Sequence, residues 1–250
     1  MSARAQIRLE GLSVGYGGRA VQRDLDLEIR RGDIFVIMGG SGCGKSTLMR
    51  AMTGLLAPLA GRILFDGESF WEVSPAARAR RIRRHGVMYQ GGALWSSMTL
   101  EENVALPLQQ YTDLGPRQVR ELVDYKLALV GLGGCGALYP AEISGGMRKR
   151  AGVARAMALD PEVLFFDEPS AGLDPLSARL LDELIVELKH SLGTTMVVVT
   201  HDLASIFAIA DEAVFLDVER GTMLTTGDPR WLRDHAADAR VRAFLRRGVV

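Results

Sequence analysis

A glycine-rich stretch constrains the fold of this chain more than any other part of it. Residues 39–47 read Gly-Gly-Ser-Gly-Cys-Gly-Lys-Ser-Thr and match the pattern G-x-x-x-x-G-K-[ST]. Glycines let the backbone curl so that successive N–H groups point at phosphate oxygens, and the lysine adds a cation. The serine hydroxyl at the last fixed position can ligate Mg²⁺. The expected phosphate-binding residues are Gly39, Gly40, Ser41, Gly42, Cys43, Gly44, Lys45, Ser46 and Thr47.

The neighbouring residues support this reading of the loop. Residues 34–38 form a short continuous apolar run, which is typical of a buried parallel strand. Residues 46–52 have the pattern of a helix, whose N-terminus would add its dipole to an anion site. The alternative is a glycine-rich turn that matches by chance. The order strand, loop, helix favours the phosphate loop over that alternative.

Composition narrows the class of protein. The 250 residues are enough for one α/β domain, or for a core with an inserted subdomain. Lys and Arg together number 30, as do Asp and Glu, and this balance argues against a chain dominated by nucleic-acid binding. Cys43 lies inside the loop, so we expect free thiols and a reducing compartment. We expect no secretion signal, because residues 1–9 lack an apolar stretch, and no apolar run approaches the roughly 18 residues of a membrane span.

The remaining pattern predicts an α/β protein that carries a helical insertion. We expect one domain over residues 1–250, with a catalytic core of about 1–90 and 160–227. A helical subdomain occupies about 91–159, and a helical tail about 228–250. Residues 76–84 include five arginines, for which we favour a solvated helix face over contact with an anionic headgroup.

Four expected strands end in residues suited to phosphate chemistry, and such ends meet at one edge of an open α/β sheet. Besides the phosphate loop they end at Gln90, at Asp167 and Glu168, and at His201. Asp167 suits a carboxylate that orients Mg²⁺, and Glu168 suits a base for the attacking water. His201 can donate to a γ-phosphate, and Gln90 can sense the metal or the water. Taken singly, each has a structural alternative; their joint order favours an active site.

With these motifs the chain resembles the nucleotide-binding subunit of ABC transporters along essentially its whole length. The matching segments also include residues 143–147 and 171–174. The resemblance implies a P-loop NTPase fold of the ABC type, with a mixed sheet and flanking helices. It also implies a head-to-tail dimer that sandwiches two ATP molecules. Tyr16 would stack on adenine, although a turn aromatic at the edge of the core is the alternative. The residues implied for the signature loop, which acts on the opposite subunit, and for the D-loop are Ser144, Gly145, Gly146 and Met147, and Asp174.

Within ABC transporters, the chain is most similar to the ATPases of Mla-type, MCE-associated lipid transport systems. Residues 144–150, 90–95, 102–108 and 170–175 carry this similarity. Most transporter ATPases have Gln where Met147 stands, which departs from the superfamily but agrees with this subgroup. The similarity implies ATP and Mg²⁺ as cofactors, and a membrane permease and an MCE-type lipid-binding protein as partners. It places the subunit peripherally on the cytoplasmic face of the inner membrane.

Other functions stay open at this stage. The chain is compatible with the ATPase of another ABC importer, or with a non-transport ABC ATPase such as one for iron–sulfur cluster assembly. Nucleic-acid-linked ABC ATPases usually carry two such domains or a long coiled-coil insertion, for which 250 residues leave no room.

A permease contact is expected just after Gln90. Trp95, Met98, Leu100 and Val104 are apolar in a segment that also carries polar residues, and we expect a groove there for a short permease helix. The alternative is that all four pack inside the helical subdomain, which is the favoured fate of Leu100 and Val104. Trp95 is the preferred contact residue, since large aromatic side chains commonly anchor interfaces.

Overall fold

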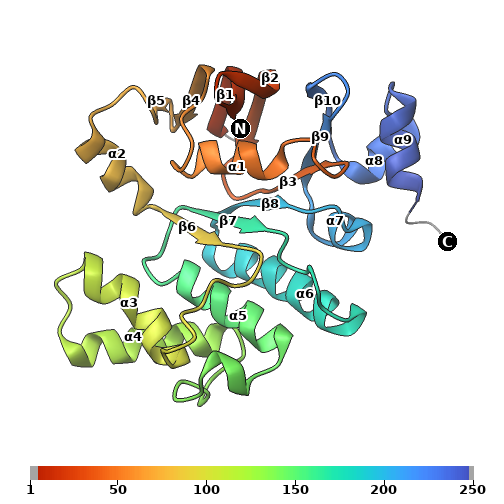
Figure 1. The fold of residues 1–250 in the computed structure, drawn as a ribbon. Coiled ribbons are helices and arrows are strands. Elements are labelled where there is room, and N and C mark those ends of the chain that lie inside the picture. Colours follow the sequence, from red (N-terminus) through yellow and green to blue (C-terminus); the bar gives the residue numbers. More distant parts are fainter. Residues whose placement is uncertain (1–4, 248–250) are drawn as a thin grey trace.

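A six-stranded sheet forms the centre of the computed structural model, which describes residues 5–247 (Figure 1). Its strand order is β10-β9-β3-β8-β7-β6, parallel except for β10, which pairs antiparallel with β9. All residues of β3 and β8 are buried, as their continuous apolar runs predict for strands covered on both faces. The strands are β3 (Ile34–Gly39), β6 (His85–Met88), β7 (Val163–Asp167), β8 (Thr195–Val199), β9 (Glu212–Asp217) and β10 (Thr222–Gly227).

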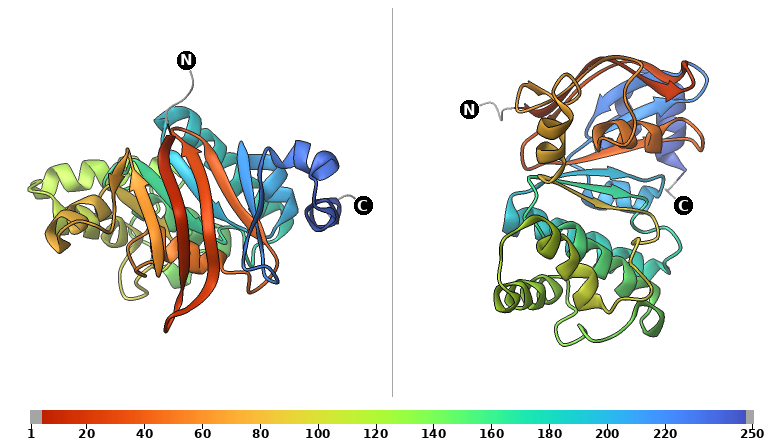
Figure 2. Two further views of the ribbon diagram at one scale, coloured as in Figure 1. Left: turned by 90° about the horizontal axis from the view of Figure 1, so that it is seen from above. Right: turned by 60° about the vertical axis from the view of Figure 1, so that its left-hand side comes forward.

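A second, antiparallel sheet lies above the first, with helix α1 (Lys45–Met52) between them (Figure 1, Figure 2). Its order is β2-β1-β4-β5, from β1 (Ala5–Tyr16), β2 (Arg19–Arg30), β4 (Ala60–Phe65) and β5 (Glu68–Ser69). Phe35 and Ile37 of β3 join the core on this side, while Val36 and Met38 join the core on the opposite face. Because side chains alternate along a strand, β3 packs into a core on each face of the central sheet. This packing holds the strand that leads into the phosphate loop.

Helices cover the other face of the central sheet (Figure 2). They are α5 (Gly145–Ala156), α6 (Pro175–Leu192) and α7 (Leu203–Ile209), with α3 (Leu100–Tyr111), α4 (Pro116–Leu129) and the 3₁₀ turn η1 (Pro140–Glu142) beyond them. Apolar residues of α3 and α4 share one core with those of α5, α6 and the sheet. The helices expected between residues 91 and 159 are therefore present, and the division into subdomains stays a prediction.

Polar side chains fix where the helices begin. Thr99 and Glu102 form a capping box at the start of α3, and Ser144 caps α5. Asp174 caps α6 and Asp202 caps α7. Each cap satisfies backbone N–H groups that would otherwise lack a partner. These side chains therefore place the loops that precede the helices.

Two short helices, α8 (Pro229–His235) and α9 (Ala239–Arg246), end the described part of the chain, within the range predicted for a helical tail. The arginine-rich helix is α2 (Pro75–Ile82), and arginines in and after it contact the chain itself. Arg81 pairs with Glu68 at 2.6 Å, and Arg83 lies 4.8 Å from the centre of the Tyr111 ring. Their guanidinium groups are thus engaged within the fold more than a purely solvated face would be. Within residues 5–247 no helix combines the length and apolarity needed to cross a membrane.

Candidate functional site

The glycine-rich loop leaves β3 and runs directly into α1. Gly39, Gly42 and Gly44 have φ angles of 148°, 75° and 96°, values that favour glycine. A Cβ atom at Gly39 would lie 2.4 Å from the carbonyl oxygen of Leu216. The loop therefore needs glycine for its curvature and for its close approach to β9. The result is a tight loop ahead of a helix N-terminus, the arrangement that binds phosphate.

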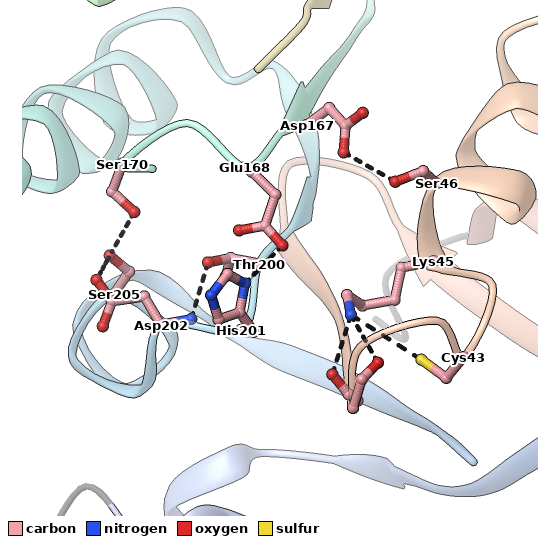
Figure 3. Close-up of polar contacts among 12 residues, drawn as sticks. Cys43, Lys45, Ser46, Asp167, Glu168, Ser170, Thr200, His201, Asp202 and Ser205 are labelled. Carbon is pink, nitrogen blue, oxygen red and sulfur yellow. Dashed lines mark hydrogen bonds and ion pairs between the residues drawn. The ribbon is translucent and has the colours of Figure 1, made fainter. Parts of the chain in front are cut away.

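Lys45 and Cys43 lie on the inner side of this loop (Figure 3). The Lys45 ammonium donates to the carbonyl oxygens of Gly39 and Gly40, each at 3.0 Å. Cys43 is 1% exposed, and burial raises the pKa of its thiol, against the opposing effect of the Lys45 charge. The thiol is thus a neutral packing group, while the lysine side chain is held against the loop backbone.

Ser46 and Asp167 come from different elements and meet beside the loop. The hydroxyl of Ser46, in the first turn of α1, donates to Asp167 Oδ1 at 3.3 Å, and Asp167 ends β7. Burial is the main cause that raises the pKa of Asp167; the Ser46 hydrogen bond opposes it. A hydroxyl and a carboxylate side by side fit Mg²⁺, which takes only one or two protein ligands beside phosphate oxygens and water. Residues 5–247 contain no cluster of three His, Cys, Asp or Glu side chains able to hold a metal by themselves.

Glu168 and His201 form a pair above the loop (Figure 3). Glu168 Oε1 lies 2.8 Å from His201 Nδ1, and the Glu168 N–H donates to the Val199 carbonyl at 2.8 Å. Glu168 has a φ of 49°, in the left-handed region that a non-glycine residue rarely adopts. Such strain is held by the surrounding structure and is common at functional sites. The arrangement presents a carboxylate, fixed by an imidazole, toward the phosphate loop.

The strand ends form a cavity of about 780 Å³. The predicted residues that line it include most of the glycine loop, Gln90, Glu168 and His201. Its other walls are Val21, Leu203, Phe244 and Arg247, which sequence reasoning missed. Phe244 belongs to α9 and packs edge-on against Phe215, so the C-terminal helix contributes a wall. No motif in the Arg-rich tail indicated this position.

Tyr16 is not part of that cavity lining. It ends β1, and its hydroxyl accepts a hydrogen bond from Arg50 Nη1 at 2.8 Å. This bond, first among several causes, lowers the pKa of the phenol. The ring is 47% exposed and lies beside α1, so its adenine-stacking role stays a prediction.

Gln90 is exposed just after β6, and a lysine from the helical part holds its backbone. Lys149 of α5 donates to the Gln90 carbonyl and, at 3.4 Å, to the Glu168 carbonyl. Lys149 is 6% exposed; burial lowers its pKa, and the charges of Glu168 and Asp167 oppose that change. Sequence reasoning missed this residue, although it lies within residues 144–150, which carry the similarity to the lipid transport ATPases.

The signature segment begins α5, away from the cavity of its own subunit. Ser144 is exposed and accepts a hydrogen bond from the Met147 N–H at 3.2 Å, while Gly145 and Gly146 start the helix. None of these four residues lines the 780 Å³ cavity. Asp174 has both carboxylate oxygens on Ser177, with Oδ1 on its N–H and Oδ2 on its hydroxyl. Action on a second subunit stays a prediction that this placement supports.

The four residues named for the permease groove differ in position, and the favoured core placement of Leu100 and Val104 is confirmed. Leu100 and Val104 are fully buried, because they are core positions of α3, so they cannot line a groove. Of the four residues named for it, Met98 lines a cleft of about 750 Å³ between α3 and α4. Trp95 is 59% exposed and lies outside that cleft lining. Its exposure agrees with a contact role, which stays a prediction.

One buried amide shapes the loop that carries Trp95. Asn103 of α3 is fully buried. Its Oδ1 accepts from the Trp95 N–H at 2.8 Å, and its Nδ2 lies 3.1 Å from the carbonyl oxygens of Trp95 and Met98 and 2.9 Å from that of Thr99. The loop therefore depends on this side chain for its shape.

Comparison with known proteins identifies relatives of this chain. The family model described as "ABC transporter" matches residues 22–171. The chain is 40% identical over 239 residues to the intermembrane phospholipid transport system ATP-binding protein MlaF of Escherichia coli K12, covering 96% of this chain and 88% of the relative. It is 38% identical over 240 residues to MlaF of Haemophilus influenzae, covering 96% and 90%.

Solved structures give the same picture. A structure of cbiO1 from Clostridium perfringens, part of the ABC transporter complex cbiONQ, has a TM-score of 0.84 and 27% identity. It covers 98% of this chain and 96% of the other. A dimeric ATP-binding cassette in a post-hydrolysis state, bound to ADP and Pi, has a TM-score of 0.78 and 26% identity. It covers 89% of this chain and 98% of the other.

Proposed function

The chain belongs to the ABC transporter family, and we propose that it is the ATP-hydrolysing subunit of a phospholipid transporter. The observation that carries the lipid assignment is its 38–40% identity, along 96% of its length, to intermembrane phospholipid transport ATPases. The chemistry rests on the strand ends, which gather the phosphate loop, Ser46 and the Glu168–His201 pair around one cavity, with Asp167 hydrogen-bonded to Ser46.

Glu168 is the residue we assign to proton acceptance. Its carboxylate takes the proton of the attacking water, and His201 holds that carboxylate in place through the 2.8 Å contact. The glycine loop and Lys45 bind the β- and γ-phosphates, so the chain supplies both positioning and charge. Mg²⁺ would be held by Ser46, Gln90 and Asp167, and when bound it neutralises phosphate charge.

Two copies of the chain would form the working unit. Ser144, Gly145 and Gly146 stand at an exposed helix N-terminus, which suits the ATP held by a second copy. A similar solved cassette is dimeric with ADP and Pi. ATP would close the two copies together and hydrolysis would reset them, a population shift driven by ligand.

The partners of this dimer would be a membrane permease and an MCE-type lipid-binding protein. With these partners, the subunit would sit peripherally on the cytoplasmic face of the inner membrane. The exposed Trp95 indole and the 750 Å³ cleft between α3 and α4 are neighbouring candidates for the permease contact. We expect Trp95→Ala to leave melting and ATP binding intact while weakening permease capture and lipid transfer between vesicles. Loss of folding would instead make Trp95 a core residue, and unchanged capture and transfer would put the contact elsewhere.

Paired variants test the chemistry. Glu168→Gln should keep ATP affinity and nearly abolish phosphate release, because an amide cannot accept the proton. Lys45→Ala should weaken ATP binding itself. Nucleotide affinity and turnover are measured for both variants beside the unaltered chain. Near-normal turnover of Glu168→Gln would remove the residue from the general-base role.

A mixing experiment tests the dimer. Ser144→Arg and Lys45→Ala subunits, each defective alone, should together give one repaired ATP site per dimer. Nucleotide occupancy is the readout, because coupling between two sites can hide turnover. If Ser144 only caps its own helix, mixing restores no site. Co-purification with a permease tests the transport role against that of a non-transport ABC ATPase.

A further inference from the structure

A mostly buried polar cluster joins α6, the start of α7 and the loop that follows β7. The Ser205 hydroxyl of α7 is its centre: Ser205 Oγ lies 2.8 Å from Asp182 Oδ2, 3.3 Å from Asp202 Oδ2 and 3.4 Å from Ser170 Oγ. Asp182, Ser170 and Ser205 are 5%, 6% and 1% exposed. Four polar side chains from three segments thus share one small region, and all of them except Asp202 are buried.

The members of this cluster stand next to the reacting pair in the chain. Ser170 follows Glu168 by two residues, and Asp202 follows His201 directly (Figure 3). Asp202 also fixes its own loop, since its N–H donates to Thr200 Oγ at 3.1 Å and its Oδ1 caps α7 by accepting from the Ala204 N–H at 3.0 Å. A shift of Ser205 therefore reaches both loops that carry the Glu168–His201 contact.

Hydrogens in the cluster are scarce. Ser205 and Ser170 each have one hydroxyl hydrogen, and carboxylate oxygens of Asp182 and Asp202 compete for the one on Ser205. Asp182 Oδ1 is buried without any hydrogen-bond partner. A buried polar group left unpaired is costly, so the site keeps this carboxylate at the expense of stability. Within residues 5–247 the hydrogen bonds of Asp182 do not reach the glycine loop, so we expect ATP binding to be independent of the cluster.

We propose that Asp182 is a positioning residue for ATP hydrolysis, which sets the spacing of Glu168 and His201 by orienting Ser205 between Ser170 and Asp202. This inference rests on the proposed ATPase function. The ionised carboxylate draws the Ser205 hydrogen toward α6, and Ser205 Oγ is then free to accept from Ser170. The loop of Glu168 and Ser170 and the loop of His201 and Asp202 are in this way both tied to α6, and the carboxylate–imidazole pair keeps its geometry.

The charges around Asp182 make the effect dependent on pH. Burial, the largest cause, raises the pKa of Asp182 to about 6, against the Ser205 hydrogen bond, and the Asp202 and Glu183 charges raise it further. The charged groups that line the same cleft as Asp182 are Arg179, Glu183 and Glu187 of α6 and Asp202 at the start of α7. Arg179, the cation in this group, forms an ion pair with Glu183 at 2.9 Å and not with Asp182.

Asp182→Asn tests the proposal, because the amide resembles the protonated acid in shape. At pH 8 we expect kcat about tenfold below that of the unaltered chain, the effect of one charge-assisted hydrogen bond, with KM for ATP changed less than about twofold. The ratio of the two kcat values should fall toward one as the pH drops below about 6, where Asp182 itself takes up a proton. Melting at pH 8 should be unchanged or higher, because a buried charge has been removed.

A second variant and a control complete the experiment. Ser205→Ala should lower kcat by the same factor, and the double variant should be no slower than either single variant, because both cut one linkage. Glu183→Gln, which alters the exposed neighbour on α6, should leave kcat unchanged. An unaltered kcat and pH profile of Asp182→Asn would overturn the proposal, as would a loss of activity that merely follows a loss of melting temperature. ATP hydrolysis by the unaltered chain, abolished in Glu168→Gln, tests the proposed function separately.

Discussion

The buried amide of Asn103 makes a stability prediction that can be worked from contacts. Its oxygen accepts one hydrogen bond, and its two N–H hydrogens serve three carbonyl oxygens between 2.9 and 3.1 Å. Three effective hydrogen bonds at a net ~1 kcal/mol each give a loss of roughly 3 kcal/mol for Asn103→Ala. In a domain of this size that corresponds to a melting temperature lower by roughly 6–12 °C.

Calorimetric melting and hydrogen exchange of the loop amides measure this loss. The Trp95 N–H in particular should lose protection, because its acceptor is gone. Asn103→Asp is the sharper comparison: it keeps the acceptor but turns a carboxylate oxygen toward three carbonyl oxygens, so it should be worse than Asn103→Ala. Gln110→Ala, at an exposed position of the same helix, is the matched control and should shift melting by less than about 2 °C. A milder effect of Asp than of Ala, or a melting point of Asn103→Ala within about 2 °C of the unaltered chain, would refute this account.

Three further predictions concern contacts between elements. Lys149→Met should lower kcat about tenfold at an unchanged melting temperature and KM, because two loop carbonyls lose their shared donor while the stem keeps its packing; equal kcat values would assign Lys149 to packing alone. Gly86→Ala should cost at least about 2 kcal/mol in urea unfolding, because the new Cβ would lie 2.1 Å from a carbonyl oxygen of α5; a neutral result would mean that β6 and α5 separate freely. Burial lowers the pKa of His85 to about 4 from 6.5, so the unfolded chain binds the proton first and stability falls as pH drops from 6.5 to 4, by roughly 3 kcal/mol in total. His85→Phe should flatten that part of the stability–pH curve, and an unchanged slope would contradict the assignment.

Strands with continuous apolar runs were predicted well from the sequence. The strand predicted at residues 34–38 before the glycine loop is Ile34–Gly39, and the strand predicted to end at Asp167 and Glu168 is Val163–Asp167. Both are buried on two faces, so a single run of apolar residues marks them without ambiguity. The second, antiparallel sheet was harder to predict. β1 extends over twelve residues with register shifts, including one between Leu9 and Leu12, and such irregularities interrupt the alternation that indicates a strand.

The residues of the site likewise differ in whether the sequence could predict them. Ser46, Asp167, Glu168 and His201 could be found because each follows a predicted strand or the loop itself, and they lie together in the structure. Lys149 and Asp182 were not found, because they act through partners 59 and 23 residues away, and no local spacing encodes such contacts. Leu100 is a core residue, as its favoured alternative predicts. The sequence alone left the groove open as well, since an apolar residue in a loop-to-helix segment looks the same in either role.

The rate at which the buried thiol of Cys43 is labelled can report opening of the phosphate loop. Alkylating reagents attack the thiolate, and this sulfur is both shielded and held protonated in the closed loop. Cys135, the other free cysteine, is partly accessible and supplies a fast reference reaction in the same molecule. The labelling rate of Cys43 relative to Cys135 therefore counts how often the loop opens. A bulky adduct on Cys43 would also have no room in the closed loop. A labelled molecule is therefore one whose loop has opened and cannot close again.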